Sequence, residues 1–103
     1  NYTTKTNLNY WDGESIYNIT CPVNHCLYPS IYNNTIVWIG NTNIESTEGN
    51  IWRFYISQKQ LNQTTFRRSS QQYPSIYNDT ISWLDNRGGL GYDIYTCKIN
   101  LLS

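Results

Sequence analysis

The apolar positions of the chain fall in short runs, rich in β-branched and aromatic residues, between clusters of Asn, Gly, Ser and Thr. This pattern predicts β-strands joined by turns. Between residues 28 and 66 the predicted strands are residues 29–32, 36–39, 51–57 and 61–66. The pair Asn33-Asn34 separates the first two strands and predicts a hairpin. Because residues 36–39 are apolar at every position, we expect this strand to be covered on both faces.

An internal repeat organises these strands. Residues 28–38 read YPSIYNNTIVW and residues 73–83 read YPSIYNDTISW, with nine of eleven positions identical at an offset of 45 residues. A second match, NIW at 50–52 with DIY at 93–95, has an offset of 43 residues. A four-stranded unit therefore occurs twice, and after its strand at residues 93–99 the second copy lacks the fourth strand.

The N-terminal stretch predicts two further strands, at residues 3–8 and 15–20, separated by the turn-forming pair Asp12-Gly13. Residues 15–20 align with the fourth strand of the repeat unit. We expect a single all-β domain over residues 1–103, made of N-terminal strands at 1–20, one unit at 21–66 and a second unit at 67–103.

The second unit reads YPSIYNDTISWLDNR and then GYDIY. It resembles the repeat of TolB-like β-propellers in microbial, especially archaeal, cell-surface proteins, in which similar strands and a D-N-R turn recur in each blade. The resemblance covers about residues 15–99. The first unit departs from it, with Gly40-Asn41-Thr42 in place of Asp85-Asn86-Arg87 and Asn50 in place of Asp93. The resemblance implies two four-stranded antiparallel blades of propeller type.

Two blades are fewer than the four to eight that close a propeller. We expect two broad apolar sheet faces to remain uncovered, which marks an interface. Either the chain is part of a longer propeller, or neighbouring copies complete it head-to-tail. In the second case the strand at 15–20 of a neighbour would complete the last sheet by strand addition. Such contacts close into a ring or continue as a filament, and the sequence leaves this choice open.

Composition narrows the classes of partner. Lysine plus arginine number seven, as do aspartate plus glutamate, so the formal net charge is zero and nucleic acid is an unsuitable partner. Aromatic residues make up 16% of the chain and charged residues 14%, which favours a packed β-rich domain over a disordered one. No run approaches the roughly 20 apolar residues of a membrane span, so none is expected.

Five N-x-T sequons indicate export and N-linked glycans. Chance placement of 14 Asn and 11 Thr would give about 1.5 sequons. Their asparagines are Asn1, Asn18, Asn33, Asn62 and Asn78. The alternative is a loop composition rich in Asn and Thr, with Asn33 and Asn78 serving as turn formers. We expect an extracellular or cell-surface location.

The spacing of Cys21 and Cys26 suits a local disulfide in an oxidising compartment. The alternatives are free thiols or a zinc site that adds His25 and the distant Cys97. We expect the disulfide and no metal. Cys97 is then the odd cysteine, either buried or available for a bond to another chain.

Candidate catalytic groups are few. His25 is the only histidine and lies between cysteines expected to be bonded, which disfavours nucleophilic catalysis. Asp85 and Asp93 are the only carboxylates in one loop system, where they could act on sugars. A structural role explains them better, because they flank a Gly-rich loop in which Arg87 can pair with a carboxylate. We expect no enzyme and no cofactor.

Two functions fit these features. The first is a non-enzymatic, exported structural subunit of a glycosylated extracellular filament or surface layer, built by blade stacking and strand exchange. The alternative is a carbohydrate-binding or adhesin module of a larger propeller, acting through the loop aromatics Tyr10, Trp11 and Tyr92. Trp38 and Trp83 occupy equivalent apolar strands, so we expect them in the core.

Overall fold

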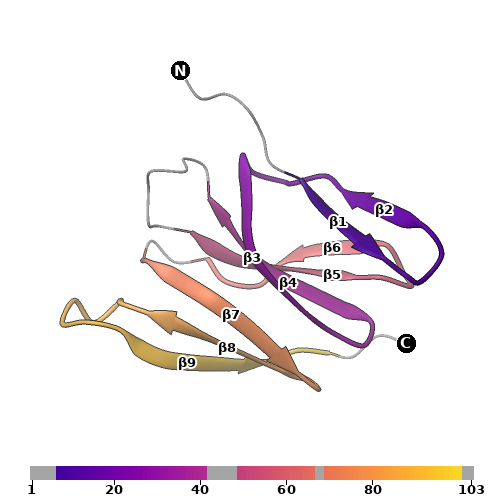
Figure 1. Cartoon of the computed structure of the whole chain (residues 1–103). Helices are drawn as coiled ribbons and strands as arrows, with labels where there is room; N and C mark the ends of the chain where they lie inside the picture. Colours follow the sequence, from indigo (N-terminus) through magenta and orange to yellow (C-terminus); the bar gives the residue numbers. More distant parts are fainter. Residues whose placement is uncertain (1–6, 42–48, 67–68, 101–103) are drawn as a thin grey trace.

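The computed structural model of the chain describes residues 7–41, 49–66 and 69–100 (Figure 1). These residues form β-strands and turns without a helix, which confirms the all-β prediction. The strands are β1 (Leu8–Trp11), β2 (Ile16–Ile19), β3 (His25–Tyr32), β4 (Thr35–Asn41), β5 (Asn50–Tyr55), β6 (Gln60–Gln63), β7 (Gln71–Tyr77), β8 (Thr80–Asp85) and β9 (Asp93–Lys98).

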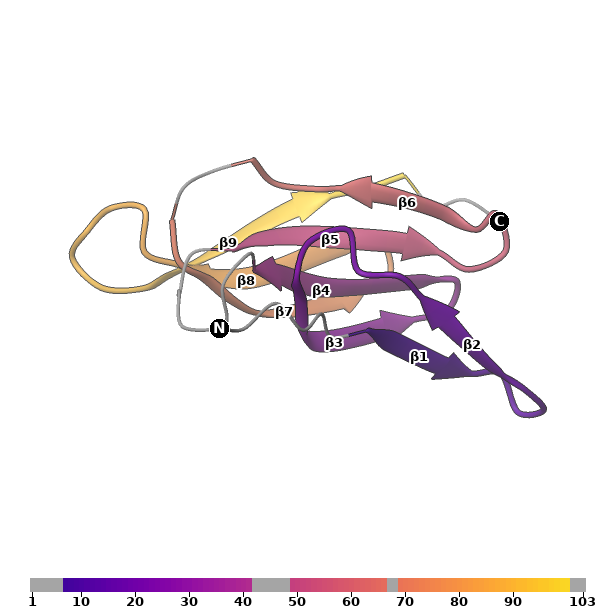
Figure 2. The same ribbon diagram turned by 90° about the horizontal axis from the view of Figure 1, so that it is seen from above.

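The strands form three antiparallel sheets that lie in layers. We call them the N-terminal hairpin (β1-β2), the central sheet (β3-β4-β5-β6) and the C-terminal sheet (β7-β8-β9). The hairpin covers one face of the central sheet and the C-terminal sheet covers the other (Figure 1). Equivalent strands of the two larger sheets, β3 with β7 and β4 with β8, run in the same direction (Figure 2).

The apolar strand β4 explains this layering. All of its residues are buried. Ile36 and Trp38 pack with the N-terminal hairpin, whereas Val37 and Ile39 pack against the C-terminal sheet. Alternate side chains of a strand point to opposite faces, so each face of β4 needs its own cover. The prediction of a strand covered on both faces is confirmed.

The first strand of each unit is longer than predicted. The predicted strand at residues 29–32 is part of β3, which begins at His25, and β7 likewise begins at Gln71. A register shift interrupts both strands, and the tyrosines within it, Tyr28 and Tyr73, both have φ 54°. Because proline cannot donate to a sheet ladder, a Pro in a strand is placed at an edge or a bulge. The prediction therefore began each strand too late.

The N-terminal prediction was displaced. The strand expected at residues 3–8 is β1, Leu8–Trp11, and residues 1–6 lie outside the described residues. The predicted turn is correct: the Asp12 carboxylate accepts the backbone N–H groups of Glu14 (2.8 Å) and Ser15 (2.9 Å), and Gly13 has φ 102°. The hairpin therefore closes around an Asx turn at the predicted position, and only its first strand lies later in the chain than the pattern predicts.

Candidate functional site

The contact between the central and C-terminal sheets repeats equivalent residues side by side. Tyr28 and Tyr73 have ring centroids 4.7 Å apart, and Tyr32 and Tyr77 have centroids 4.8 Å apart. Beside these rings lies an apolar cluster of buried residues from both sheets: Val37, Ile39, Ile51, Ile76, Ile81 and Trp83. The two units are therefore stacked so that these tyrosines of the first strands lie beside their repeat equivalents.

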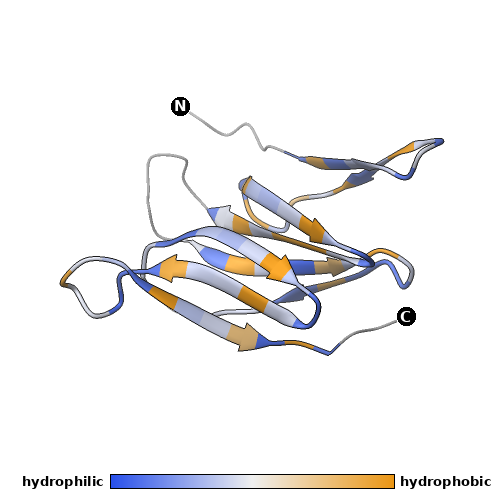
Figure 3. Ribbon diagram, turned by 60° about the horizontal axis from the view of Figure 1, so that its bottom comes forward, coloured by the Kyte–Doolittle hydropathy of each residue, from blue (hydrophilic) through white to orange (hydrophobic). Residues whose placement is uncertain are grey.

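The outer face of the C-terminal sheet has no cover among the described residues (Figure 3). By register and alternation it carries Ser75, Tyr77, Thr80, Ser82, Leu84, Ile94, Thr96 and Lys98. The expectation of a broad apolar face is wrong here, because Ser82 stands where the first unit has the buried Val37. Apolar character persists at Ile94, which is 74% exposed, whereas its equivalent Ile51 is fully buried.

The edge of the C-terminal sheet is also open. Strand β9 pairs with β8 on one side and is the last strand of its sheet. In the central sheet the equivalent strand β5 pairs with β4 and also with β6. An unpaired edge presents a row of backbone N–H and C=O groups that another strand can bind. The described chain thus contains one four-stranded sheet and one sheet a strand short of it.

A second uncovered area lies beside the N-terminal hairpin. A hollow of about 210 Å³ separates β1 from the central sheet, and it is lined by Asn9, Tyr10, Pro29, Ser30, Ile31 and Ile36. Ile31 is 57% exposed, whereas its equivalent in the second unit, Ile76, is 6% exposed because the central sheet covers it. The hairpin therefore covers only part of the face on which it lies.

The hairpin is held by aromatic and cationic contacts that the sequence did not indicate. Tyr10 and Tyr17 stack with centroids 5.2 Å apart. The Lys59 ammonium, from the β5–β6 turn, donates to the Tyr10 hydroxyl at 2.8 Å and lies 4.8 Å from the Tyr17 ring centroid. Cation–π contacts of this kind at exposed sites contribute about 0.5–1 kcal/mol.

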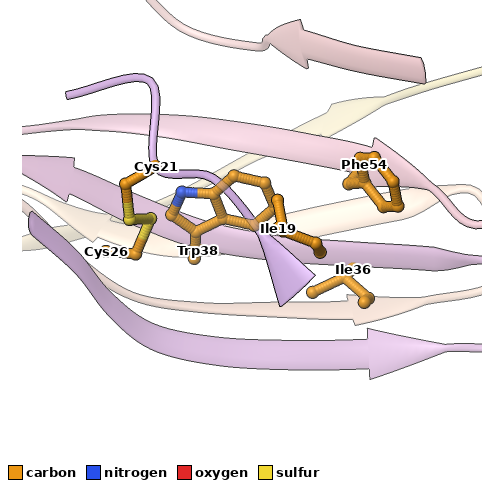
Figure 4. Close-up of a cluster of buried hydrophobic side chains, with 6 residues drawn as sticks. All are labelled: Ile19, Cys21, Cys26, Ile36, Trp38 and Phe54. Carbon is orange, nitrogen blue, oxygen red and sulfur yellow. A yellow bond between two sulfur atoms is a disulfide. The ribbon is translucent and has the colours of Figure 1, made fainter. Parts of the chain in front are cut away.

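Cys21 and Cys26 form a disulfide, in agreement with the expectation. It lies beside Trp38 and Ile19 in the cluster under the hairpin (Figure 4). Two of the three sulfurs of the alternative zinc site are therefore bonded to each other. Cys97 is a half-buried free thiol on the opposite side of the central sheet, and burial raises its pKa.

Asp85 and Arg87 form a local pair at the end of β8. The Asp85 carboxylate, fully buried, accepts from the Arg87 backbone N–H (2.9 Å), its guanidinium (2.7 Å) and the Trp83 indole (3.1 Å). Burial opposes its ionisation, but these hydrogen bonds outweigh that effect and lower the pKa to about 2. The Arg87 guanidinium also lies 4.1 Å from the Tyr95 ring centroid. Asp93, opposite Asp85 in the register, is exposed.

The described sequon asparagines differ in exposure. Asn18, Asn33 and Asn78 are exposed, and the last two begin the equivalent two-residue hairpin loops with φ 50° and 57°. Asn62 lies within β6 and is half-buried, and its buried side-chain oxygen has no hydrogen-bond partner among the described residues. Asn1 lies outside the described residues.

The aromatic residues separate into core and surface. Trp38 and Trp83 are 0% and 5% exposed, which confirms their placement in the core. Trp11 is 70% exposed at the end of β1. Tyr92 is 45% exposed, and its hydroxyl donates to Ser70 at 2.8 Å.

Comparison with known proteins finds no family model and no curated protein that matches this chain. In the part of the chain that the structure describes, no helix has the length and apolar character of a membrane crossing. Within the same residues, no group of three His, Cys, Asp or Glu side chains is placed to hold a metal ion.

Proposed function

We propose that the chain is a non-enzymatic, exported structural subunit of a glycosylated extracellular filament or surface layer. In this assembly, propeller-type sheet units stack and exchange strands between head-to-tail copies. The observation that carries the proposal is the difference between the two units. Among the described residues, the central sheet has four strands, with the C-terminal sheet on one face and the hairpin over part of the other, whereas the C-terminal sheet has an uncovered outer face and an open edge at β9. The repeat supports the proposal, because the first unit has a fourth strand and a covering sheet at the places that are open in the second unit.

Export and glycosylation are supported by the disulfide and by the sequons. Disulfides persist in oxidising compartments and are rare in the cytosol of mesophiles. Asn33 and Asn78 are exposed in adjacent, equivalent turns, because the preceding residues Tyr32 and Tyr77 are in ring contact. Glycans on both would form a row along one end of the stacked sheets.

The proposal assigns no catalytic role to the chain, and the burial of His25 and Asp85 supports this. His25 is 4% exposed at the start of β3, and Asp85 is buried and paired with Arg87. A general base or nucleophile has to reach a substrate, and neither group is accessible to one.

Light scattering on the purified chain tests the assembly. We expect species far above the 12.1 kDa of one chain, with a proportion that rises with protein concentration. A monodisperse monomer at every accessible concentration contradicts the proposal. Electron microscopy of the large species then distinguishes a filament from a closed ring.

The alternative is a carbohydrate-binding or adhesin module. It is favoured by Trp11, which is exposed, and by a hollow of about 280 Å³ between the central and C-terminal sheets. Thr64, Phe66, Arg87 and Tyr95 are among the residues that line this hollow and combine aromatic rings with polar groups, as sugar sites do. A glycan array distinguishes this function: binding by the wild type that is lost in Trp11→Ala or Phe66→Ala supports it.

A further inference from the structure

Strands β1, β5 and β9 are equivalent members of the repeat. Asn7, Asn50 and Asp93 follow one another at two intervals of 43 residues, and each precedes an apolar residue, Leu8, Ile51 and Ile94. The strand β2 corresponds to β6 at an offset of 45 residues. The pairing confirms both offsets, because Trp11 is opposite Ile16 in the hairpin and its equivalent Phe54 is opposite Leu61 in the central sheet.

The N-terminal hairpin therefore consists of the third and fourth strands of a unit. The C-terminal sheet contains the first, second and third strands of a unit. The hairpin lacks the first and second strands of a unit, and the C-terminal sheet lacks the fourth. The third strand is present in both, as β1 and as β9.

We propose that β9 of one copy replaces β1 of the next copy, pairs with its β2, and brings the outer face of the C-terminal sheet over the hollow beside the hairpin. The occupant of the open β9 edge is thus β2 of a second copy. The inference rests on the proposed function, since it requires head-to-tail association, and it specifies the strand and the register through which association occurs.

The pattern of burial supports this exchange. Ile31 and Ile94 are exposed, whereas their equivalents Ile76 and Ile51 are buried at the contact within the chain. In the exchanged contact Ile94 takes the place of Leu8, and strands β7 and β8 lie over Ile31. Both exposed isoleucines become covered, as the repeat equivalents are.

The competition between β1 and β9 favours β9. Strand β1 has four residues, and its only partner among the described strands is β2. Strand β9 has six residues and is already fixed to β8 along its length. The ladder that β2 gives up when β1 leaves is re-formed with β9. The exchange loses the contacts of Tyr10 with Tyr17 and Lys59 and gains the apolar surface that the C-terminal sheet covers.

The register yields a crosslinking test. By equivalence with Phe54 and Leu61, Cys97 of one copy lies opposite Ile16 of the next. In Ile16→Cys under mild oxidation we expect a disulfide to the native Cys97 of another copy, seen as a ladder on a non-reducing gel. Mass spectrometry of a mixture of isotopically labelled and unlabelled chains identifies the linked peptides and shows that they come from different copies.

Two variants control the test. Tyr17→Cys moves the thiol one residue along β2 to the opposite face, so it should give little of this product. Trp11→Cys/Ile16→Cys/Cys97→Ser closes a disulfide within the hairpin and should abolish the large species in light scattering, whereas Cys97→Ser alone keeps it.

The outcomes separate the two proposals. The strand exchange is overturned, while the assembly stands, if large species form without the 16–97 linkage. The same conclusion follows if Tyr17→Cys gives an equal yield of crosslinked product, or if the locked hairpin leaves the large species unchanged. A wild type that stays monomeric overturns both.

Discussion

Tyr32 and Tyr77, equivalent residues of the two repeat units, contact each other through their rings with centroids 4.8 Å apart. Tyr28 and Tyr73, at the register shift nearer the start of the same strands, make a second contact of the same kind. Tyr77 is 73% exposed, so its ring is the open end of one of these rows. Stacking of the units thus brings like residues together, and the row ends where a further unit would continue it.

The contact between Tyr32 and Tyr77 should be measurable as a coupling. Aromatic pairs contribute about 0.5–1.5 kcal/mol beyond the area that they bury. In a double-mutant cycle of Tyr32→Leu and Tyr77→Leu, monitored by urea unfolding, we expect a coupling free energy in that range. Tyr32→Leu combined with Tyr17→Leu is the control and should be additive, because Tyr17 lies with the hairpin on the other side of the central sheet. A cycle that is additive for Tyr32 and Tyr77 would show that the ring contact contributes no stability of its own.

Asp85 should give the fold a specific dependence on pH. Its pKa is about 2 in the folded chain, below its ordinary value of 3.8, so its ion pair stabilises the fold above pH 4 and is lost as the pH falls toward 2. The shift corresponds to about 2 kcal/mol. Between pH 6 and pH 2, the free energy of unfolding of the wild type should fall by about that much more than that of Asp85→Asn.

The variant Asp93→Asn is the matched control for Asp85→Asn. Asp93 is the register neighbour of Asp85 but is exposed, so its substitution should keep the steeper decline of the wild type. Equal declines in the wild type and Asp85→Asn would mean that the buried ion pair does not set the acid sensitivity.

The sequence predicted the stacked units because their repeat is nearly identical and because β4 is apolar on both faces. It missed the first part of β3, which is separated from the predicted part by the bulge where Tyr28 has positive φ directly before Pro29. Residues before proline favour extended backbone, so this conformation is set by the bulge and by the ring contact with Tyr73, not by local preference.

The hairpin was harder to place from the sequence. Strand β1 reads LNYW, in which polar and apolar residues alternate over only four positions, and such a run is a weak signal. Its equivalence to β5 and β9 rests on the spacing of Asn7, Asn50 and Asp93. This spacing can be recognised only once the pairing of Trp11 with Ile16 gives the register. The clamp of Lys59 on Tyr10 and Tyr17 joins residues distant in sequence and has no local signature.

The sequons should be occupied unequally when the chain is made in a glycosylating host. Asn33 and Asn78 are exposed at the start of equivalent loops and should carry glycans. Asn62 lies within β6 opposite Arg53, with its side-chain oxygen buried, so a glycan there would disturb the sheet. Intact-mass and peptide mass spectrometry should show loss of one glycan in Asn78→Gln and no change in Asn62→Gln. A glycan at Asn62 on folded, secreted chain would contradict the assignment.

Gly40 explains why the first unit lacks the ion pair of the second. It stands at the position equivalent to Asp85, and a Cβ there would meet the Trp52 ring at 2.7 Å and Val23 at 2.9 Å. The Trp52 side chain therefore fills the space that a carboxylate occupies in the second unit. In the described part of the chain the indole nitrogen of Trp38 has no hydrogen-bond partner, whereas that of Trp83 donates to Asp85. Gly40→Ala should destabilise the fold by about 1–3 kcal/mol, as overpacking does.

Gly88→Ala is the control, because nothing lies within 4 Å of its Cβ, and should change the free energy of unfolding by less than about 0.5 kcal/mol. If urea unfolding shows both variants to be equally stable, Trp52 can move aside, and Gly40 is then not the reason that the two units differ.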